Sequence, residues 1–149
     1  MSVTEANAIV VDRLLPHAPD KVWRALTQSD LIAEWLMKND FQPRVGHRFN
    51  LRATPVPGRW NGVFDCEVVA LEPGARLVWR QTLSGDEKPD GIDTLVAWTL
   101  TPEAGGTRLR LEHSGFRPGV DDGIFESMKG GWAHLVGGLE RLLAGLPSS

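Results

Sequence analysis

The residues of this sequence that could carry out covalent or acid–base chemistry inside a fold are Cys66 and His113. Each stands in a segment with the two-residue period of a strand, at a position predicted to face the interior. A cysteine thiolate beside an imidazole would be a nucleophile. No third residue is identifiable that would orient His113, so we interpret Cys66 as an inert buried thiol and His113 as a hydrogen-bonded structural residue. We therefore name no catalytic residue.

Other polar residues leave an enzymatic alternative open. His113, Gln81 or a carboxylate such as Asp65 could polarise a carbonyl group or a water molecule held in the interior. The other three of the four histidines fall in different elements and lack a metal-ligand spacing such as H-E-x-x-H. The sequence also lacks a G-x-S-x-G nucleophile motif, a phosphate-binding glycine loop and a nucleotide fingerprint. We expect no metal and no cofactor.

A predicted long C-terminal helix must form one side of the interior that holds these residues. Its apolar residues recur in the steps of three and four that mark a helix buried along one side. They are Phe125, Met128, Trp132, Leu135, Leu139, Leu142 and Leu146. This stripe predicts a helix over Asp122–Leu146. The pairs Gly130–Gly131 and Gly137–Gly138 each lie inside it, where a glycine costs roughly 1 kcal/mol relative to alanine. We expect steric reasons for these glycines, with Gly130–Gly131 admitting a neighbouring strand or ligand volume beside Trp132.

Strands and two short helices are predicted for the rest of the chain. The aliphatic run Ile9–Leu15 suits an opening strand, and Pro19 and Ser29 or Asp30 mark the starts of two short helices. Five further strands follow, at about residues 47–53, 60–71, 77–82, 96–100 and 108–113. Their hairpin-length connections predict an antiparallel sheet, which must curl around the long helix because one helix cannot cover it flat. The expected fold is α+β, with about six strands.

The inward faces of these elements define a candidate ligand-binding site. Its members are mostly apolar and aromatic with a few polar groups, as in small-molecule pockets. They are Trp35, Trp60, Phe64, Cys66, Trp79, Gln81, Trp98, Leu111, His113, Met128, Trp132 and Leu135. The alternative is that these residues simply fill a core, since interiors are made of the same residue types. Trp35 could either pack the second short helix down or act as a gate over the ligand.

Length, charge and cysteine content restrict the partners. A chain of 149 residues fits one domain, over residues 1–149 with its core at about 9–146. The net charge of −3 is spread along the chain without a basic stripe, so we expect neither nucleic acid nor a membrane as a partner. Cys66 is the single cysteine, and the polar start Met1–Asn7 lacks the apolar run of a signal peptide. These features predict a cytoplasmic protein.

Several motifs of the chain together resemble a known superfamily. They are Ala18–Pro19–x–x–Val22–Trp23–x–x–Leu26–Thr27 followed by Trp35, the turn Glu72–Pro73–Gly74–x–x–Leu77–Val78, the hairpin Gly106–Thr107–x–Leu109, the run His113–Ser114–Gly115–Phe116, and Gly131–Trp132. In this order they resemble the START-like, or SRPBCC, superfamily, and most closely its branch named for the activator of the heat-shock-protein ATPase. The resemblance covers about Ile9 to Leu146.

This resemblance implies a helix-grip fold with a deep cavity between the sheet and the C-terminal helix. Superfamily members hold lipids, steroids, polyketides and other apolar molecules there, and a minority catalyse cyclisation or hydrolysis. The eukaryotic co-chaperone of the branch has an additional domain, for which we expect no room in this chain.

We therefore expect a cytoplasmic binding protein for a small apolar or aromatic molecule, with lipid among the ligand classes that the superfamily implies. One alternative is a cyclase- or hydrolase-type enzyme that uses the same cavity. Another is a protein-interaction module related to the co-chaperone, with a role in the stress response. A homodimer and a chaperone partner stay open.

Overall fold

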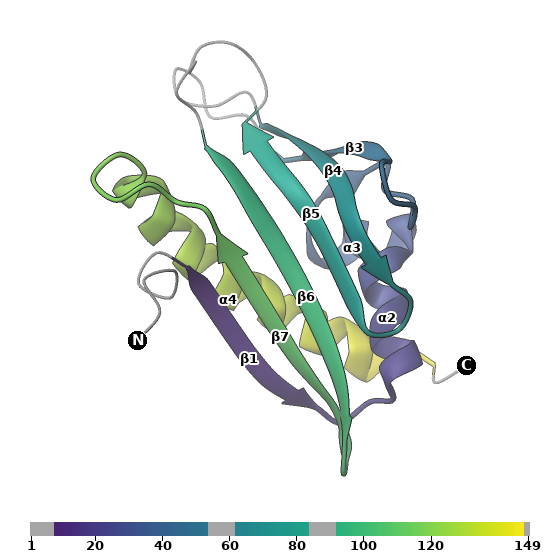
Figure 1. The fold of residues 1–149 in the computed structure, drawn as a ribbon. Coiled ribbons are helices and arrows are strands. Elements are labelled where there is room, and N and C mark those ends of the chain that lie inside the picture. The colour runs from purple at the N-terminus through teal and green to yellow at the C-terminus, as the bar shows by residue number, and fades with distance from the viewer. Residues whose placement is uncertain (1–7, 54–61, 84–91, 148–149) are drawn as a thin grey trace.

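The computed structural model describes residues 8–53, 62–83 and 92–147. The chain order is β1 (Ile9–Leu15), α2 (Pro19–Thr27), α3 (Ser29–Trp35), β2 (Lys38–Asn39), β3 (Arg48–Arg52), β4 (Val63–Glu72), β5 (Arg76–Leu83), β6 (Asp93–Glu103), β7 (Gly106–Ser114) and α4 (Asp122–Gly145). Figure 1 shows the strands as one curved layer, with the helices on a single side of it. The predicted α+β helix-grip fold is confirmed.

The strands within the described residues form a seven-stranded sheet in the order β1-β7-β6-β5-β4-β3-β2, and every neighbouring pair is antiparallel. The first strand thus pairs with the last one, because α2 and α3 carry the chain from one edge of the sheet to the other. We predicted about six strands. The additional one is β2, whose two residues are too few to show a two-residue period.

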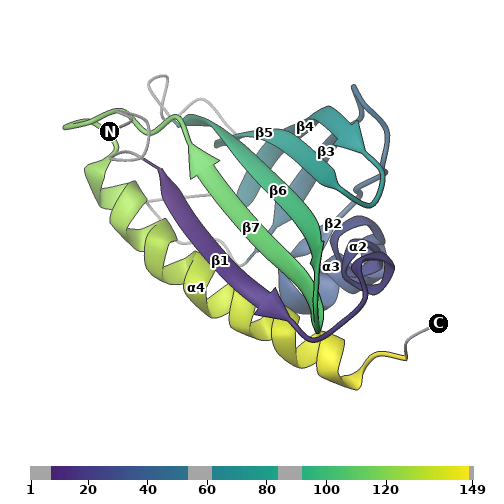
Figure 2. The ribbon, with the colours of Figure 1, turned by 60° about the horizontal axis from the view of Figure 1, so that its bottom comes forward.

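The long helix α4 crosses the inner side of the sheet. Figure 2 shows α4 along β1, with α2 and α3 beside its C-terminal end. The helix begins at Asp122 as predicted and ends at Gly145, with Leu146 as its C-cap residue. Contacts of α4 with β1, α2 and α3 hold it in this position. None of the described helices combines the length and the hydropathy of a membrane-crossing segment.

A close approach between the end of β1 and the start of β7 explains one glycine. Gly106 begins β7 with a φ of 152°, and a Cβ atom on it would clash with the backbone of Leu15 at the end of β1. The next residue, Thr107, donates a hydrogen bond of 2.7 Å from its hydroxyl group to the carbonyl oxygen of His17. These contacts set where β1 leaves the sheet and where α2 starts.

The predicted strand faces agree with the observed burial. Leu109, Leu111 and His113 are buried along β7, as are Phe64, Cys66 and Val68 along β4. On β4 the alternation stops after Val68, because the register with β5 shifts between Val68 and Ala70. An irregularity of this kind turns the following side chains, which is why the apolar residues at the end of β4 blurred the sequence pattern.

The buried face of α4 is centred slightly away from the predicted stripe. Its fully buried residues are Trp132, Val136, Leu139 and Leu143. Leu135 and Leu142, which we placed on the stripe, are only half-buried. Both still pack against the core, as do Phe125, Met128 and Leu146 of the stripe. The stripe missed the buried Val136 and Leu143, because adjacent apolar pairs, such as Leu135–Val136, fit the helical period almost equally well.

Candidate functional site

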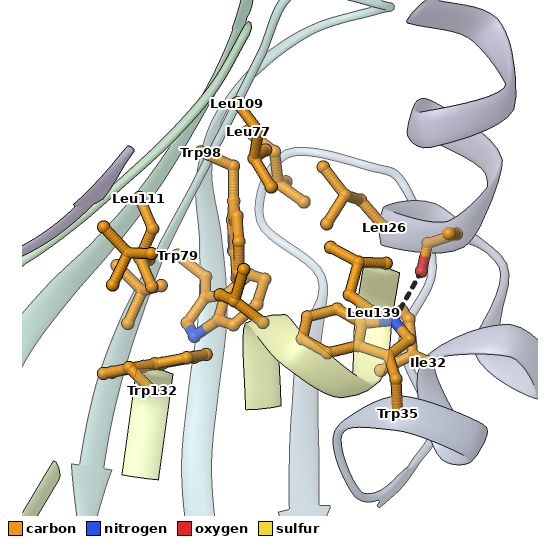
Figure 3. Close-up of a cluster of buried hydrophobic side chains, with 14 of the residues drawn as sticks. Leu26, Ile32, Trp35, Leu77, Trp79, Trp98, Leu109, Leu111, Trp132 and Leu139 are labelled. Carbon is orange, nitrogen blue, oxygen red and sulfur yellow. Dashed lines mark hydrogen bonds between the residues drawn. The ribbon is translucent and has the colours of Figure 1, made fainter. Parts of the chain in front are cut away.

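Four tryptophan side chains meet between the sheet and α4. Trp98 from β6 is at their centre and is 0% exposed. Its ring lies 5.6 Å from that of Trp35 and 5.6 Å from that of Trp132, both edge to face, and 6.1 Å from that of Trp79. Figure 3 shows these rings converging from the sheet, α3 and α4. Edge-to-face geometry at these distances is a favourable aromatic arrangement, so the tertiary fold joins residues that the sequence spreads over four elements.

Trp35 connects the two short helices to this cluster. Its indole N–H donates a hydrogen bond of 2.9 Å to the carbonyl oxygen of Ala25 on α2, drawn as a dashed line in Figure 3. The bond ties α3 to α2, while the ring contacts Trp98. Trp35 therefore packs the second short helix against its surroundings, which is the first of the two roles that we considered. That Trp35 also acts as a gate stays a prediction.

A chain of buried hydrogen bonds runs through His113. Trp132 donates from its indole nitrogen to Nδ1 of His113 over 2.8 Å. An indole N–H is only a donor, so Nδ1 must accept and the neutral imidazole carries its proton on Nε2. Nε2 then donates over 2.8 Å to the hydroxyl group of Thr94, which donates over 2.9 Å to the carbonyl oxygen of Gln81. The donors and acceptors of this chain are mutually consistent, and both nitrogens of His113 are occupied.

Burial keeps His113 uncharged. The side chain is 0% exposed, and its removal from water lowers the pKa of His113 to about 3. A neutral imidazole with both nitrogens bonded is a poor general base, because it has no free lone pair for a substrate proton. His113 therefore has the structural environment that we predicted for it.

Cys66 is buried and far from His113. Burial and the nearby carboxylates of Asp65 and Asp40 raise the pKa of the Cys66 thiol above its usual range. Three strand spacings separate β4 from β7 in the sheet, a distance of ~14 Å at 4.8 Å per spacing. The thiol–imidazole pair that we considered is therefore not formed, and Cys66 packs as a small apolar side chain.

Trp98 differs from the other tryptophans of the cluster in its hydrogen bonding. Trp79 donates to the Gln81 side-chain oxygen over 3.0 Å, and Trp35 and Trp132 also have acceptors. The indole nitrogen of Trp98 is buried and has no hydrogen-bond partner among the described residues. A buried polar group without a partner is uncommon in folded proteins and requires an explanation.

The remaining predicted site residues lie around this centre with different burial. Phe64 and Leu111 are buried in the core, whereas Met128 and Leu135 of α4 are half-buried against it. Trp60 lies outside the described residues. The sequence analysis missed Thr94, although it is two residues before Val96 and shares its inward face.

The glycines of α4 have different surroundings from those we expected. A Cβ atom added at Gly130 or Gly131 would meet no atom within 4 Å, so no strand approaches there. At Gly138 it would lie 3.8 Å from the backbone oxygen of Trp35 and make ordinary contacts. The neighbouring strand proposed for Gly130–Gly131 is therefore wrong, and the open space around the pair is the remaining explanation.

A groove of about 350 Å³ lies between β1 and the N-terminal half of α4. Phe125, Lys129 and Ala133 line it from the helix, and Ile9 and Val11 are among the residues that line it from β1. Ile9 and Val11 pair directly with His113 and Leu111 of β7. Arg13 and the exposed Val10 also line the groove and none of the four tryptophans does, so the groove lies at the β1 edge of the sheet, apart from the cluster.

No group of three or more metal-ligating side chains comes together within the described residues. The structure therefore offers no described cluster on which to base a metal site.

Comparisons with known proteins agree with this architecture. The family described as Activator of Hsp90 ATPase homolog 1-like protein matches residues 16–144. The chain belongs to this family, whose fold is of the START-like, or SRPBCC, type. A search of curated proteins finds no match.

Solved structures extend the likeness over the whole domain. Protein MLL2253 from Mesorhizobium loti is 46% identical, with a TM-score of 0.83 over 94% of this chain and 98% of that one. DynU16, a protein in the dynemicin biosynthetic locus, is 30% identical with a TM-score of 0.78, over 95% of this chain but 49% of its own. Protein BH1534 from Bacillus halodurans is 25% identical with a TM-score of 0.74, over 91% of this chain and 96% of its own. The family and these structures fit a ligand-binding fold.

Proposed function

We propose that this protein binds a small apolar or aromatic molecule between the sheet and the N-terminal half of α4. The observations that carry the proposal are the tryptophan cluster around Trp98, enclosed by a sheet and a helix, and the separate groove between β1 and α4. Aromatic linings with a few placed polar groups are typical of small-molecule sites. A relative in a biosynthetic locus also supports a small-molecule role.

The chemistry of the interior favours binding over catalysis by the residues that we considered. His113 has both nitrogens occupied, and the Cys66 thiol is held in its protonated form by burial. A nucleophile must be deprotonated and a general base must have a free lone pair. Neither condition is met by these two side chains.

Identification of the natural ligand is the direct test. Native mass spectrometry of the protein purified from its own host should detect a bound small molecule that is lost on denaturation. In parallel, the ligand-free protein should bind the neutral dye N-phenyl-1-naphthylamine saturably, with an increase in dye fluorescence. A protein that carries no ligand and binds the dye only non-saturably would contradict the proposal.

Two leucines of α4 provide a matched pair for locating the site. Leu135 and Leu142 are both half-buried and lie seven residues apart, which is about two helical turns. Leu135→Ala should weaken dye binding by about tenfold, because it removes apolar contacts worth roughly 1.4 kcal/mol. Leu142→Ala, nearer the C-terminal end, should change it by less than about twofold. Equal effects of both variants would place the dye elsewhere.

A further inference from the structure

The strand β1 lies at one end of the sheet, with β7 on one side of it and the groove on the other. Backbone N–H and C=O groups of an antiparallel strand point alternately, residue by residue, to its two sides. The carbonyl oxygen of Leu15 faces β7, where Gly106 approaches it. The carbonyl oxygen of Asp12 instead accepts an exposed hydrogen bond of 3.1 Å from the guanidinium group of Arg13. The backbone groups of Asp12, and of the residues two positions before and after it, therefore point away from the sheet.

These outward backbone groups are open. Outside the β1–β7 ladder, no backbone hydrogen bond joins residues 8–14 to another described residue. Val10 and Leu14 of this strand are also 41% and 47% exposed. An edge strand with open backbone groups and exposed apolar side chains is a template for a further strand. At the other end of the sheet, β2 has two residues, so β1 with its seven is the better template.

The groove gives this edge a second wall. Figure 2 shows α4 running along β1. Helix residues spaced by four and alternate strand residues form the two walls: Phe125, Lys129 and Ala133 from α4, and Ile9, Val11 and Arg13 from β1. Where an extended peptide adds to a sheet edge, backbone hydrogen bonds provide affinity and pockets for alternate side chains provide specificity. The edge and the groove together offer both.

Two cations of the groove determine which charge a peptide should carry. Lys129 is exposed and has no ion-pair partner among the described residues. Arg13 makes a long ion pair with Glu140, 3.9 Å from Nε to Oε1, in which both side chains are 45% exposed. An exposed pair of this kind contributes little to stability. The carboxylate of Asp12 binds Arg108 of β7 over 2.7 Å. The groove therefore favours acidic side chains beside apolar ones.

We propose that the free edge of β1 binds an extended peptide of a partner protein as an additional strand, with apolar and acidic side chains directed into the groove. This interaction goes beyond small-molecule binding, because it uses the backbone of β1 and a protein partner. A second copy of this chain is a poorer occupant of the edge. Its β1 would bring another Arg13 to the cations of the groove, and like charges on adjacent strands repel.

Two peptides with acetylated and amidated ends test the charge preference. The acidic peptide Glu-Thr-Val-Thr-Val-Thr-Glu places glutamate and valine on one face of a strand, in either chain direction. The basic peptide has lysine in place of both glutamates. Isothermal titration calorimetry at low ionic strength should show the acidic peptide binding about tenfold more tightly, because its charges attract the two cations and those of the basic peptide repel them.

A charge reversal tests whether the groove causes this preference. Lys129→Glu should remove the preference for the acidic peptide, because the variant presents a carboxylate where the cation was. Lys38→Glu is the matched control, since Lys38 is an exposed lysine of β2 at the opposite end of the sheet. This control should leave both affinities within about twofold of the wild-type values.

N-methylated versions of the acidic peptide test backbone pairing. In antiparallel addition the threonines bond to the open groups of β1, so N-methylation of the threonines should weaken binding at least tenfold and N-methylation of the valines by less than about threefold. The opposite result corresponds to parallel addition and equally supports an added strand. In ¹⁵N-labelled protein, the amide protons of Val10 and Leu14 should move downfield and exchange more slowly with water when the acidic peptide binds.

Four results would overturn the proposal. They are no binding of either peptide at millimolar concentration, equal binding of both, tolerance of both methylation patterns, and unchanged Val10 and Leu14 amide signals. Sedimentation velocity covers the remaining occupant: a dimer that excludes the acidic peptide would assign the edge to a second copy and contradict a peptide partner. Binding of N-phenyl-1-naphthylamine is measured separately on the peptide-free protein, so small-molecule binding and strand addition can fail independently.

Discussion

The two halves of α4 pack on the rest of the molecule in different ways. In the C-terminal half, Val136, Leu139 and Leu143 are fully buried, where α4 meets α2 and α3. In the N-terminal half, Trp132 is buried, but Phe125 and Met128 are only half-buried, and the space around Gly130–Gly131 is open. The comparison indicates that one half anchors the helix and the other half covers the candidate site. The following predictions test that division, from the largest expected effect to the smallest.

The anchoring half should dominate stability. Leu139→Ala should lower the free energy of unfolding by about 2–5 kcal/mol, because it leaves a cavity in a fully packed region. Met128→Ala, which shortens a half-buried side chain in the N-terminal half, should cost about 1 kcal/mol. Urea denaturation of both variants measures the difference. Equal losses would remove the distinction between the two halves.

Acid should destabilise the protein because it favours protonation of His113. This residue accepts a hydrogen bond from Trp132 in the N-terminal half of α4. The pKa of His113 is about 3 in the folded protein, whereas an exposed histidine has a pKa of 6.5, so between these values the unfolded chain binds a proton that the folded chain does not. The contribution of His113 to stability is therefore complete well above pH 6.5 and should fall by up to roughly 1.4 kcal/mol per pH unit as the pH decreases toward 4.5.

Two histidine variants test whether His113 causes this pH dependence of stability. His113→Gln should flatten the slope of unfolding free energy between pH 6.5 and 4.5, whereas His17→Gln should retain most of it. The pKa of His17 is also lowered, first by burial and then by Lys21, but this side chain is more exposed. The lowered pKa values of Asp93 and Asp121 affect stability mainly below about pH 4. An unchanged slope in His113→Gln would contradict the buried neutral state.

Loss of the hydrogen bond between Trp132 of α4 and His113 of β7 should lower the stability of the protein moderately. Trp132→Phe keeps an aromatic ring but leaves Nδ1 of His113 without its donor, which should cost about 1–3 kcal/mol. The natural control is Trp35→Phe, which removes a comparable bond at the other end of the cluster. Thermal unfolding of the two proteins measures both losses. No loss in Trp132→Phe would mean that the His113 chain contributes nothing to stability.

The smallest change in stability is expected for a substitution of Gly131, and this change should be an increase. An added methyl group there would meet no neighbouring atom, so Gly131→Ala should stabilise the protein by up to ~1 kcal/mol through helix propensity. If the open space serves the ligand, the same variant should bind N-phenyl-1-naphthylamine more weakly. A stabilised variant with unchanged dye affinity would mean that the glycine does not shape the site.

Much of the architecture could be predicted from the sequence, because periodicity records which side of an element is buried. The inward faces of β4 and β7 and the start of α4 at Asp122 are confirmed. The structural environment of His113 and the burial of Cys66 are also confirmed. The two-residue β2 and the centre of the buried face of α4 were not predicted correctly, since a very short strand and adjacent apolar residues carry little periodic signal.

The sequence by itself determined the residue types that line the interior and the order of the elements that carry them. Local backbone preferences and the two periods, 2 and 3.6, depend only on neighbours along the chain. The tertiary structure decided which of these side chains meet. The bond from Trp132 to His113 and the unpartnered N–H of Trp98 depend on strand register and on the rotation of α4 about its axis. These are set by packing between elements far apart in sequence, so no local pattern contains them.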